Sequence, residues 1–201
     1  MSARIIPFHS RTPQSTTQPL EQREDDELML LARAGRKEAF DELVQRYQLS
    51  ALKTAARFLG DSQTAIEVVQ QAFVELLRYI PTYQTQGKFS AFFYRIVLNR
   101  CRMLVRKRAS THRMLQTVRH QPLKQPQLPD DQLIAQQRRD IIDGAMAQLG
   151  PKHRAVIALR FAGDLSYQEI ADTLEIPIGT VKSRIAKGLA KLRQLLAEVT
   201  L

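Results

Sequence analysis

Residues 165–196 constrain the fold of this chain most strongly, because they place two short amphipathic helices on either side of a tight turn. They read LSYQEIADTLEIPIGTVKSRIAKGLAKLRQLL. Ser166 precedes Glu169 by three residues, the spacing of a capping box at a helix start. Pro177 separates the first helix from a second one that begins at Ile178. The second helix places an apolar set on one face: Val181, Ile185, Leu189, Leu192 and Leu196. The pattern predicts a helix-turn-helix whose second helix enters a DNA major groove.

The second helix of this motif has a small and basic face opposite its apolar one. Small side chains allow close approach to base edges, and basic ones suit phosphates. No acid occurs between Glu175 and Glu198. An ordinary amphipathic helix with a solvated basic face is the alternative, but it leaves the capped preceding helix and the turn unexplained. We predict that DNA is contacted by Thr180, Lys182, Ser183, Arg184, Ala186 and Lys187.

Positive charge is concentrated in the middle of the chain. The formal net charge is +10, and the segment between Glu75 and Asp130 holds eleven Lys and Arg residues without one acid. A localised excess of this size favours a polyanionic partner, although an anionic membrane surface would attract the same patch. No apolar run is long enough to span a bilayer, and no signal-peptide pattern opens the chain. We therefore expect a cytoplasmic protein.

Nothing in the sequence indicates catalysis. The single cysteine, Cys101, lies in an apolar helical pattern and reads as a small core residue. The histidines lack metal-ligand spacing, and there is neither a Gly-rich phosphate loop nor a nucleophile–base signature. We expect no catalytic residue, metal, cofactor or small-molecule substrate.

The apolar periodicity predicts an all-α protein with two helical domains joined by a flexible linker. Residues 1–23 are rich in Ser, Thr, Gln and Pro and are predicted to be disordered. Residues 24–108 form the first domain, in which Asp61 caps the third helix and Ser90 caps a long fourth helix ending at Arg108. Residues 109–129 form a Pro- and Gln-rich linker that is expected to leave the two domains free of each other. Residues 130–201 form the second domain, which contains the helix-turn-helix and is broken at Gly150-Pro151 and Gly163-Asp164.

The predicted fourth helix carries a second nucleic-acid signal. Arg95, Asn99, Arg102 and Arg106 recur at steps of four, three and four residues and so share one face. Tyr83 lies in the polar loop before this helix and is the best candidate to stack on an unpaired base. The aromatic residues inside the helix favour a core role instead: Phe89, Phe92 and Phe93.

Four motifs in order resemble the extracytoplasmic-function sigma factors, the small promoter-specificity subunits of bacterial RNA polymerase. DDELMLLARAGRKEAFDELVQRY resembles the first segment of that family, and TAIEVVQQAFVELL resembles its helix for the clamp helices of polymerase. YQTQGKFSAFFYRIVLNRCRMLVRKR resembles the segment that melts and reads the −10 element. The stretch from Leu149 to Leu196 resembles the domain that reads the −35 element. Gln71 stands where the family usually has an acid, and Phe92 replaces a usual tryptophan.

The resemblance implies partners and residue roles. It implies core RNA polymerase and promoter DNA as partners, together with an anti-sigma factor, which in the family is often membrane-bound. It implies polymerase contacts at Glu67, Gln70 and Gln71, and −35 contacts at the face of the last helix. The −10 contacts that it implies are Tyr83, Arg95, Asn99, Arg102, Arg106, Lys107 and Arg108. Two alternatives stay open, a free-standing helix-turn-helix regulator and a basic module that binds RNA or an anionic surface.

Overall fold

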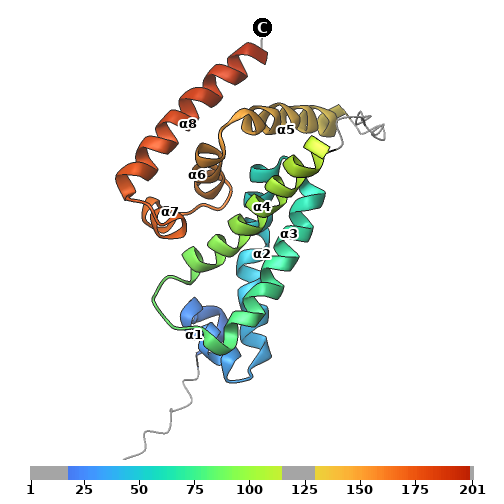
Figure 1. Ribbon diagram of the computed structural model, residues 1–201. Helices are drawn as coiled ribbons and strands as arrows, with labels where there is room; N and C mark the ends of the chain where they lie inside the picture. Colours follow the sequence, from blue (N-terminus) through green and yellow to red (C-terminus); the bar gives the residue numbers. More distant parts are fainter. Residues whose placement is uncertain (1–17, 115–129, 200–201) are drawn as a thin grey trace, which may run out of the picture.

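The protein is described by a computed structural model that covers residues 18–114 and 130–199 (Figure 1). Within these ranges every regular element is a helix, as the apolar periodicity predicts. The first unit comprises α1 (Asp25–Arg33), α2 (Lys37–Leu59), α3 (Ser62–Tyr79) and α4 (Phe89–Met114), with short 3-10 turns η1 (Leu20–Gln22) and η2 (Ile80–Thr82). The second unit comprises α5 (Asp130–Gln148), α6 (Pro151–Phe161), α7 (Tyr167–Leu174) and α8 (Ile178–Val199).

Local signals set most helix ends in the first unit. The carboxylate of Asp61 accepts from the amides of Gln63 and Thr64, so the predicted cap of α3 is confirmed. Gly60 takes the left-handed conformation (φ 71°) that ends α2. The predicted cap of α4 is wrong, because the helix starts at Phe89 and Ser90 lies inside its first turn. The predicted end at Arg108 is also too early, since α4 continues to Met114 into the segment assigned to the linker.

Aromatic side chains fill the centre of the first unit. Phe93 is fully buried, with its ring centroid 4.7 Å from that of Phe73 and 5.4 Å from that of Tyr47. Phe89 is buried as well, and the half-buried Phe92 packs on Tyr79. The predicted core role of these aromatics is confirmed, as is the burial of Cys101, where burial raises the pKa of the thiol to about 12.

The N-terminal segment is ordered further than expected. Residues 18–23 belong to the stretch predicted to be disordered, yet Leu20–Gln22 form η1. The guanidinium of Arg46 on α2 donates to the carbonyls of Leu20, Glu21 and Arg23 and also pairs with Asp25 and Glu42. The partly buried guanidinium of Arg46 thus ties the η1 segment to α2 through main-chain carbonyls, including those of Glu21 and Arg23. Residues 1–17 lie outside the described residues.

The second unit contains the predicted helix-turn-helix. The hydroxyl of Ser166 accepts from the amide of Glu169, whose carboxylate accepts from the amide of Ser166, so the capping box is present. Glu175 takes a left-handed conformation (φ 53°) in the turn between α7 and α8. Gly188 lets α8 approach α6 closely, because a Cβ there would lie 2.6 Å from Cδ1 of Ile157. The breaks expected near Gly150 and Gly163 are confirmed by the ends of α5 and α6.

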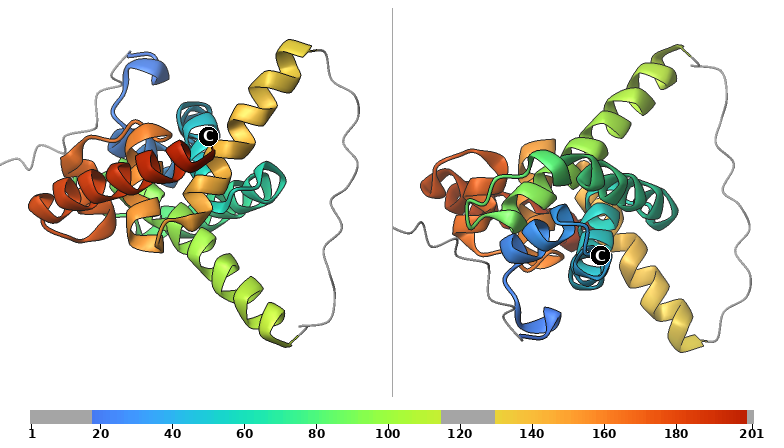
Figure 2. Two further views of the ribbon diagram at one scale, coloured as in Figure 1. Left: turned by 90° about the horizontal axis from the view of Figure 1, so that it is seen from above. Right: turned by 90° about the horizontal axis from the view of Figure 1, so that it is seen from below.

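The two units pack against each other, contrary to the expectation that they are free of each other. Helices α6 and α5 contact α2, and α7 lies against α4 (Figures 1 and 2). Tyr94 is buried between the units, with its hydroxyl 3.5 Å from the carbonyl of Gly163. Buried apolar side chains from both units form one continuous cluster. Residues 115–129, which hold most of the predicted linker, lie outside the described residues. Across the described helices, none has the length and apolarity needed to cross a membrane.

Candidate nucleic-acid interface

The exposed face of α8 matches the sequence prediction. Val181 and Ile185 are buried against the rest of the second unit, which turns the opposite side of the helix outward. Lys182, Ser183 and Ala186 are exposed there. Lys187 is exposed too, whereas Thr180 and Arg184 are half-buried. Leu189 departs from the predicted apolar face, since 37% of it is exposed and Leu195 is buried instead. The helix therefore offers a small and cationic surface with little steric obstruction.

The predicted polymerase contacts lie on one exposed side of α3. Glu67, Gln70 and Gln71 are exposed, while Val68 and Val69 between them are buried in the first unit. Gln71 also accepts a long hydrogen bond of 3.4 Å from Arg100, which pairs at 2.6 Å with Glu75. The three side chains are thus accessible to a protein partner without any change in the fold.

The predicted −10 residues are divided along α4. Asn99, Arg106, Lys107 and Arg108 are exposed. Arg108 reaches back to the start of α3, where it donates to the hydroxyl of Thr64 at 2.6 Å. The cations at the far end of α4 are therefore accessible, and one of them is tied to its own domain.

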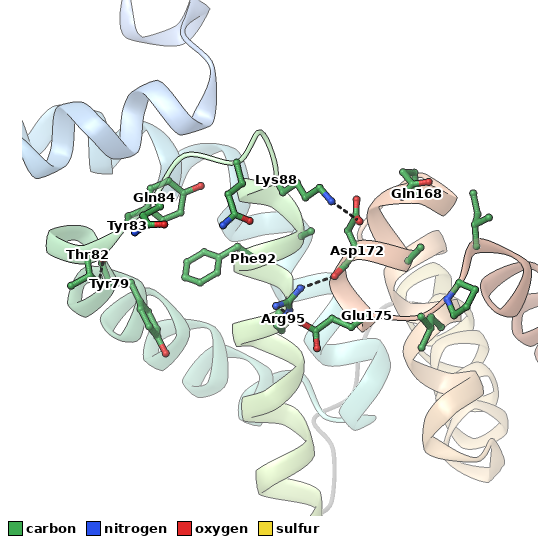
Figure 3. A pocket seen from close by; sticks show the side chains of 16 residues that line it. Tyr79, Thr82, Tyr83, Gln84, Lys88, Phe92, Arg95, Gln168, Asp172 and Glu175 are labelled. Atoms are coloured by element: carbon green, nitrogen blue, oxygen red, sulfur yellow. Dashed lines mark hydrogen bonds and ion pairs between the residues drawn. The ribbon is translucent and has the colours of Figure 1, made fainter.

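Arg95 is half-buried, and the second unit engages its guanidinium instead of leaving it free for the predicted DNA contact. Its guanidinium donates to the carbonyl of Asp172 at 2.7 Å and to that of Thr173 at 3.4 Å, and it pairs with the Glu175 carboxylate at 2.7 Å (Figure 3). These acceptors lie at the C-terminal end of α7, where the helix dipole is negative. The end of α7 thus occupies Arg95 with the kind of acceptors that a nucleic-acid backbone would supply.

A groove of about 780 Å³ lies beside this contact, between α4 with its preceding loop and the end of α7 (Figure 3). Lys88 crosses one side of it and pairs with Asp172 at 3.0 Å. Arg57 pairs with Asp143 at 2.9 Å elsewhere on the interface. In each ion pair between the units, among the described residues, the cation belongs to the first unit and the acid to the second.

Tyr83 is not presented to solvent either. Only 7% of it is exposed, and its ring packs against Phe89 and Phe92, with centroids 6.2 and 5.6 Å away. Its hydroxyl donates to the carboxylate of Asp26. Burial, reinforced by Asp26, raises the pKa of Tyr83, so the phenol stays protonated and remains a donor. The ring predicted to stack on an unpaired base is thus buried in this arrangement, because neighbouring aromatics and an acid from α1 hold it inward.

Cations from both predicted DNA surfaces meet in a second cleft. Arg102 and Arg106 of α4, Arg184 of α8, and Lys152 and Arg154 of α6 line a space of about 410 Å³. Burial, and then the charges of Arg106 and Arg184, lower the pKa of Arg102. The predicted −10 and −35 surfaces are therefore adjacent here, which no spacing in the sequence indicates. The described residues hold no cluster of His, Cys, Asp or Glu suited to a metal.

Comparison with known proteins decides the family. The Sigma-70 region 2 family matches residues 43–111, and the Sigma-70, region 4 family matches residues 145–194. The ECF RNA polymerase sigma factor SigW of Bacillus subtilis is 30% identical over 175 residues, which cover 82% of this chain and 92% of SigW. The chain belongs to the extracytoplasmic-function sigma factors.

Other relatives agree with this membership. The RNA polymerase sigma-H factor of Pseudomonas aeruginosa is 29% identical over 177 residues, covering 84% of this chain and 92% of that protein. The solved structure of CnrH in complex with the cytosolic domain of CnrY superimposes with a TM-score of 0.68 at 26% identity, covering 87% of this chain and 97% of CnrH. The sigma factor RpoE of Bartonella quintana, solved with the anti-sigma factor NepR, shares the fold with a TM-score of 0.59 at 21% identity.

As a member of this family, the chain is a sigma factor that directs bacterial core RNA polymerase to promoters, and it is not an enzyme. The first unit, α1–α4, carries sigma region 2, and the second unit, α5–α8, carries region 4. The two alternatives of a free-standing regulator and a basic interaction module are not favoured. Sequence reasoning overlooked Lys88, Asp172 and Glu175, since nothing in the pattern indicates that α7 packs on α4.

Proposed function

We propose that this sigma factor divides promoter recognition between its two domains, with α8 reading −35 duplex and α4 with its preceding loop capturing unpaired −10 bases. The observation that carries this proposal is the outward face of α8, where Ser183, Ala186 and Lys187 are exposed while Val181 and Ile185 are buried. On α4, the exposed amide of Asn99 is the group suited to read a base edge. Taking a base out of the stack costs a few kcal/mol, which contacts of this kind offset.

The contacts with polymerase are assigned to the exposed side of α3, at Glu67, Gln70 and Gln71. Polymerase acts on the chromosome in the cytoplasm of a bacterium, which places this protein there too. No cofactor or small-molecule substrate enters this scheme.

The packed arrangement of the two domains represents a state that cannot read a −10 element through Arg95. The same guanidinium cannot bind the α7 carbonyls and a DNA phosphate at once. Region 4 therefore has to leave α4 when the protein joins polymerase and DNA. Arg102 and Arg106 would be released from the cleft with Arg184 in the same step.

An anti-sigma factor is a further expected partner. CnrH and the Bartonella quintana RpoE were each solved with a second protein, CnrY and the anti-sigma factor NepR respectively. This chain carries a groove of about 780 Å³ between its two domains that a polypeptide segment can enter. Such a partner would hold the domains together and keep α4 covered.

Run-off transcription with core polymerase tests the division of labour. Lys187→Ala is expected to weaken promoter binding and, if it loses a phosphate contact, to lower the salt slope by about one unit. Asn99→Ala is expected to spare duplex binding and to impair strand opening, and a premelted −10 region is expected to restore part of its activity. Equal rescue of Lys187→Ala by premelting would contradict the assignment to separate domains. Failure of the intact protein to bind bacterial core polymerase would contradict the polymerase contacts.

A further inference from the structure

The loop between η2 and α4 is held at both of its ends by one helix, α1. At its start, the hydroxyl of Tyr83 donates to the carboxylate of Asp26, and the guanidinium of Arg33 donates to the carbonyl of Tyr83 at 3.0 Å. At its end, the amide of Gly87 donates to the other carboxylate oxygen of Asp26. Asp26 and Arg33 are separated by about two helical turns, so α1 lies along the loop and fixes it from one side.

The geometry of the loop depends on these contacts. Gly87 has a φ of 64°, a left-handed conformation in which its amide turns toward Asp26. Between the two anchored ends, Gln84, Thr85 and Gln86 are all exposed. The described loop has no regular hydrogen-bonding ladder of its own from residue 83 to 88, so its shape depends on the contacts with α1 together with the packing of the Tyr83 ring on Phe89 and Phe92.

The neighbouring acid on α1 has a different task. Asp25 pairs with Arg46 at 2.9 Å and accepts from the hydroxyl of Tyr47 at 2.5 Å, both on α2. Asp25 therefore fastens α1 to the body of the domain, whereas Asp26 faces the loop. Of these two consecutive carboxylates, Asp25 contacts α2 and Asp26 contacts the loop. Substitution of Asp25 is therefore a matched control for substitution of Asp26.

We propose that Asp26 and Arg33 are positioning residues for −10 recognition, because they hold the loop from Tyr83 to Gly87 in the shape that faces an unpaired base. This inference rests on the proposed function, which places −10 capture on α4 and this loop. Neither residue touches DNA in the proposal. Asp26 acts by accepting two hydrogen bonds from the loop, and charge-assisted bonds of this kind are about twice as strong as neutral ones. Loss of the carboxylate leaves the loop free to sample other conformations.

Selection from a promoter library tests the proposal. Holoenzyme assembled from core polymerase and the full chain is offered forked DNA whose −10 non-template strand is randomised, and the bound DNA is sequenced. Wild type is expected to enrich particular bases at one or more positions. Asp26→Ala is expected to reduce that enrichment by roughly fivefold or more, the scale of one lost base-specific contact. Tyr83→Phe keeps the ring, removes one of the two donors to Asp26 and is expected to give a smaller loss at the same position.

Two matched variants separate positioning from folding. Asp25→Ala is expected to lower the melting temperature and keep the base preference, because its contacts lie within the scaffold. Asp41→Ala removes an exposed carboxylate from α2 and is expected to change neither quantity.

Enrichment profiles of Asp26→Ala and Tyr83→Phe that superimpose on wild type would overturn the positioning role. If Asp26→Ala does not fold, an unchanged profile for Tyr83→Phe and Arg33→Gln overturns it. An equal loss of base preference in Asp25→Ala and Asp26→Ala would also overturn the positioning role. The loss would then be explained by lower stability of the fold and not by the shape of the loop. A wild-type chain that binds polymerase without any preference at the −10 positions would refute the proposed function itself.

Discussion

Neutralising the acidic end of α7 should release the −10 surface of this sigma factor. The double variant Asp172→Asn, Glu175→Gln removes two carboxylates that pair with Lys88 and Arg95 at 3.0 and 2.7 Å. It leaves in place the two main-chain carbonyls to which Arg95 donates. The closed arrangement should therefore weaken without a change in the fold of either domain.

The size of the effect follows from the exposure of the two pairs. The Lys88 and Glu175 side chains are 55% and 71% exposed, so each pair contributes at the level of a surface salt bridge, about 0.2–1 kcal/mol. Their joint loss of roughly 0.4–2 kcal/mol corresponds to a shift of about two- to thirtyfold toward the open form. Screening should reduce the difference from wild type at high salt, because both pairs are solvent-exposed.

Two measurements on the free protein check this prediction. Binding of a short single-stranded oligonucleotide should tighten by the same factor. Energy transfer between dyes on Gln45→Cys and Lys191→Cys should report separation of the domains, since the buried Cys101 does not compete for label. Asp164→Asn with Glu198→Gln removes the same charge from region 4 but leaves the pairs with Lys88 and Arg95 intact, and it serves as the control. An equal gain in binding for both double variants, with unchanged energy transfer, would refute the reasoning and leave only general electrostatics.

Three further results are expected. Gln70→Ala should fold normally and weaken binding to core polymerase in a pull-down titration, whereas unchanged binding would remove this residue from the interface. The hydrogen bond from the Thr64 hydroxyl lowers the pKa of Asp61, as do those from the backbone amides and Arg108, while burial opposes the shift. The Asp61 carboxylate therefore stabilises the folded protein above the pKa that it has in the unfolded chain. This contribution is lost as the pH falls through the lower pKa of the folded state. Asp61→Asn should thus flatten the acid limb of a melting-temperature profile. Cys101 should resist a thiol reagent in native protein and react on unfolding, because burial raises its pKa to about 12.

The sequence correctly predicted the features that depend on a single helix. The capping box at Ser166, the cap at Asp61 and the outward face of α8 follow from spacing along a single segment. The family was also within reach, because four motifs stand in the order that sigma factors share. Helix ends were less certain, and α4 continued past Arg108 because no glycine or proline stops it there.

Contacts between distant segments account for the remaining differences. Tyr83 reads as a loop aromatic, and only its meeting with Asp26, 57 residues earlier in the chain, explains its burial. The sequence pattern predicts that Arg95 contacts DNA. In the structure its guanidinium donates to carbonyls that lie 77 and 78 residues later in the chain. These contacts are made by a carboxylate in the first turn of α1 and by main-chain carbonyls at the end of α7, so spacing in the sequence carries no signal of them.

The close approach of α6 to α8 at Gly188 bears on how promoter preference can change. Helix α8 packs on the rest of region 4 through its buried side, which includes Gly188, Val181 and Ile185. Side chains on the outward side have no part in that packing. Mutations at Ser183, Ala186 or Lys187 therefore carry little penalty in folding, and under the proposed −35 role of this face the DNA sequence that the helix prefers is free to change. Promoter preference can in this way change during evolution while the buried side of α8 stays under selection for packing.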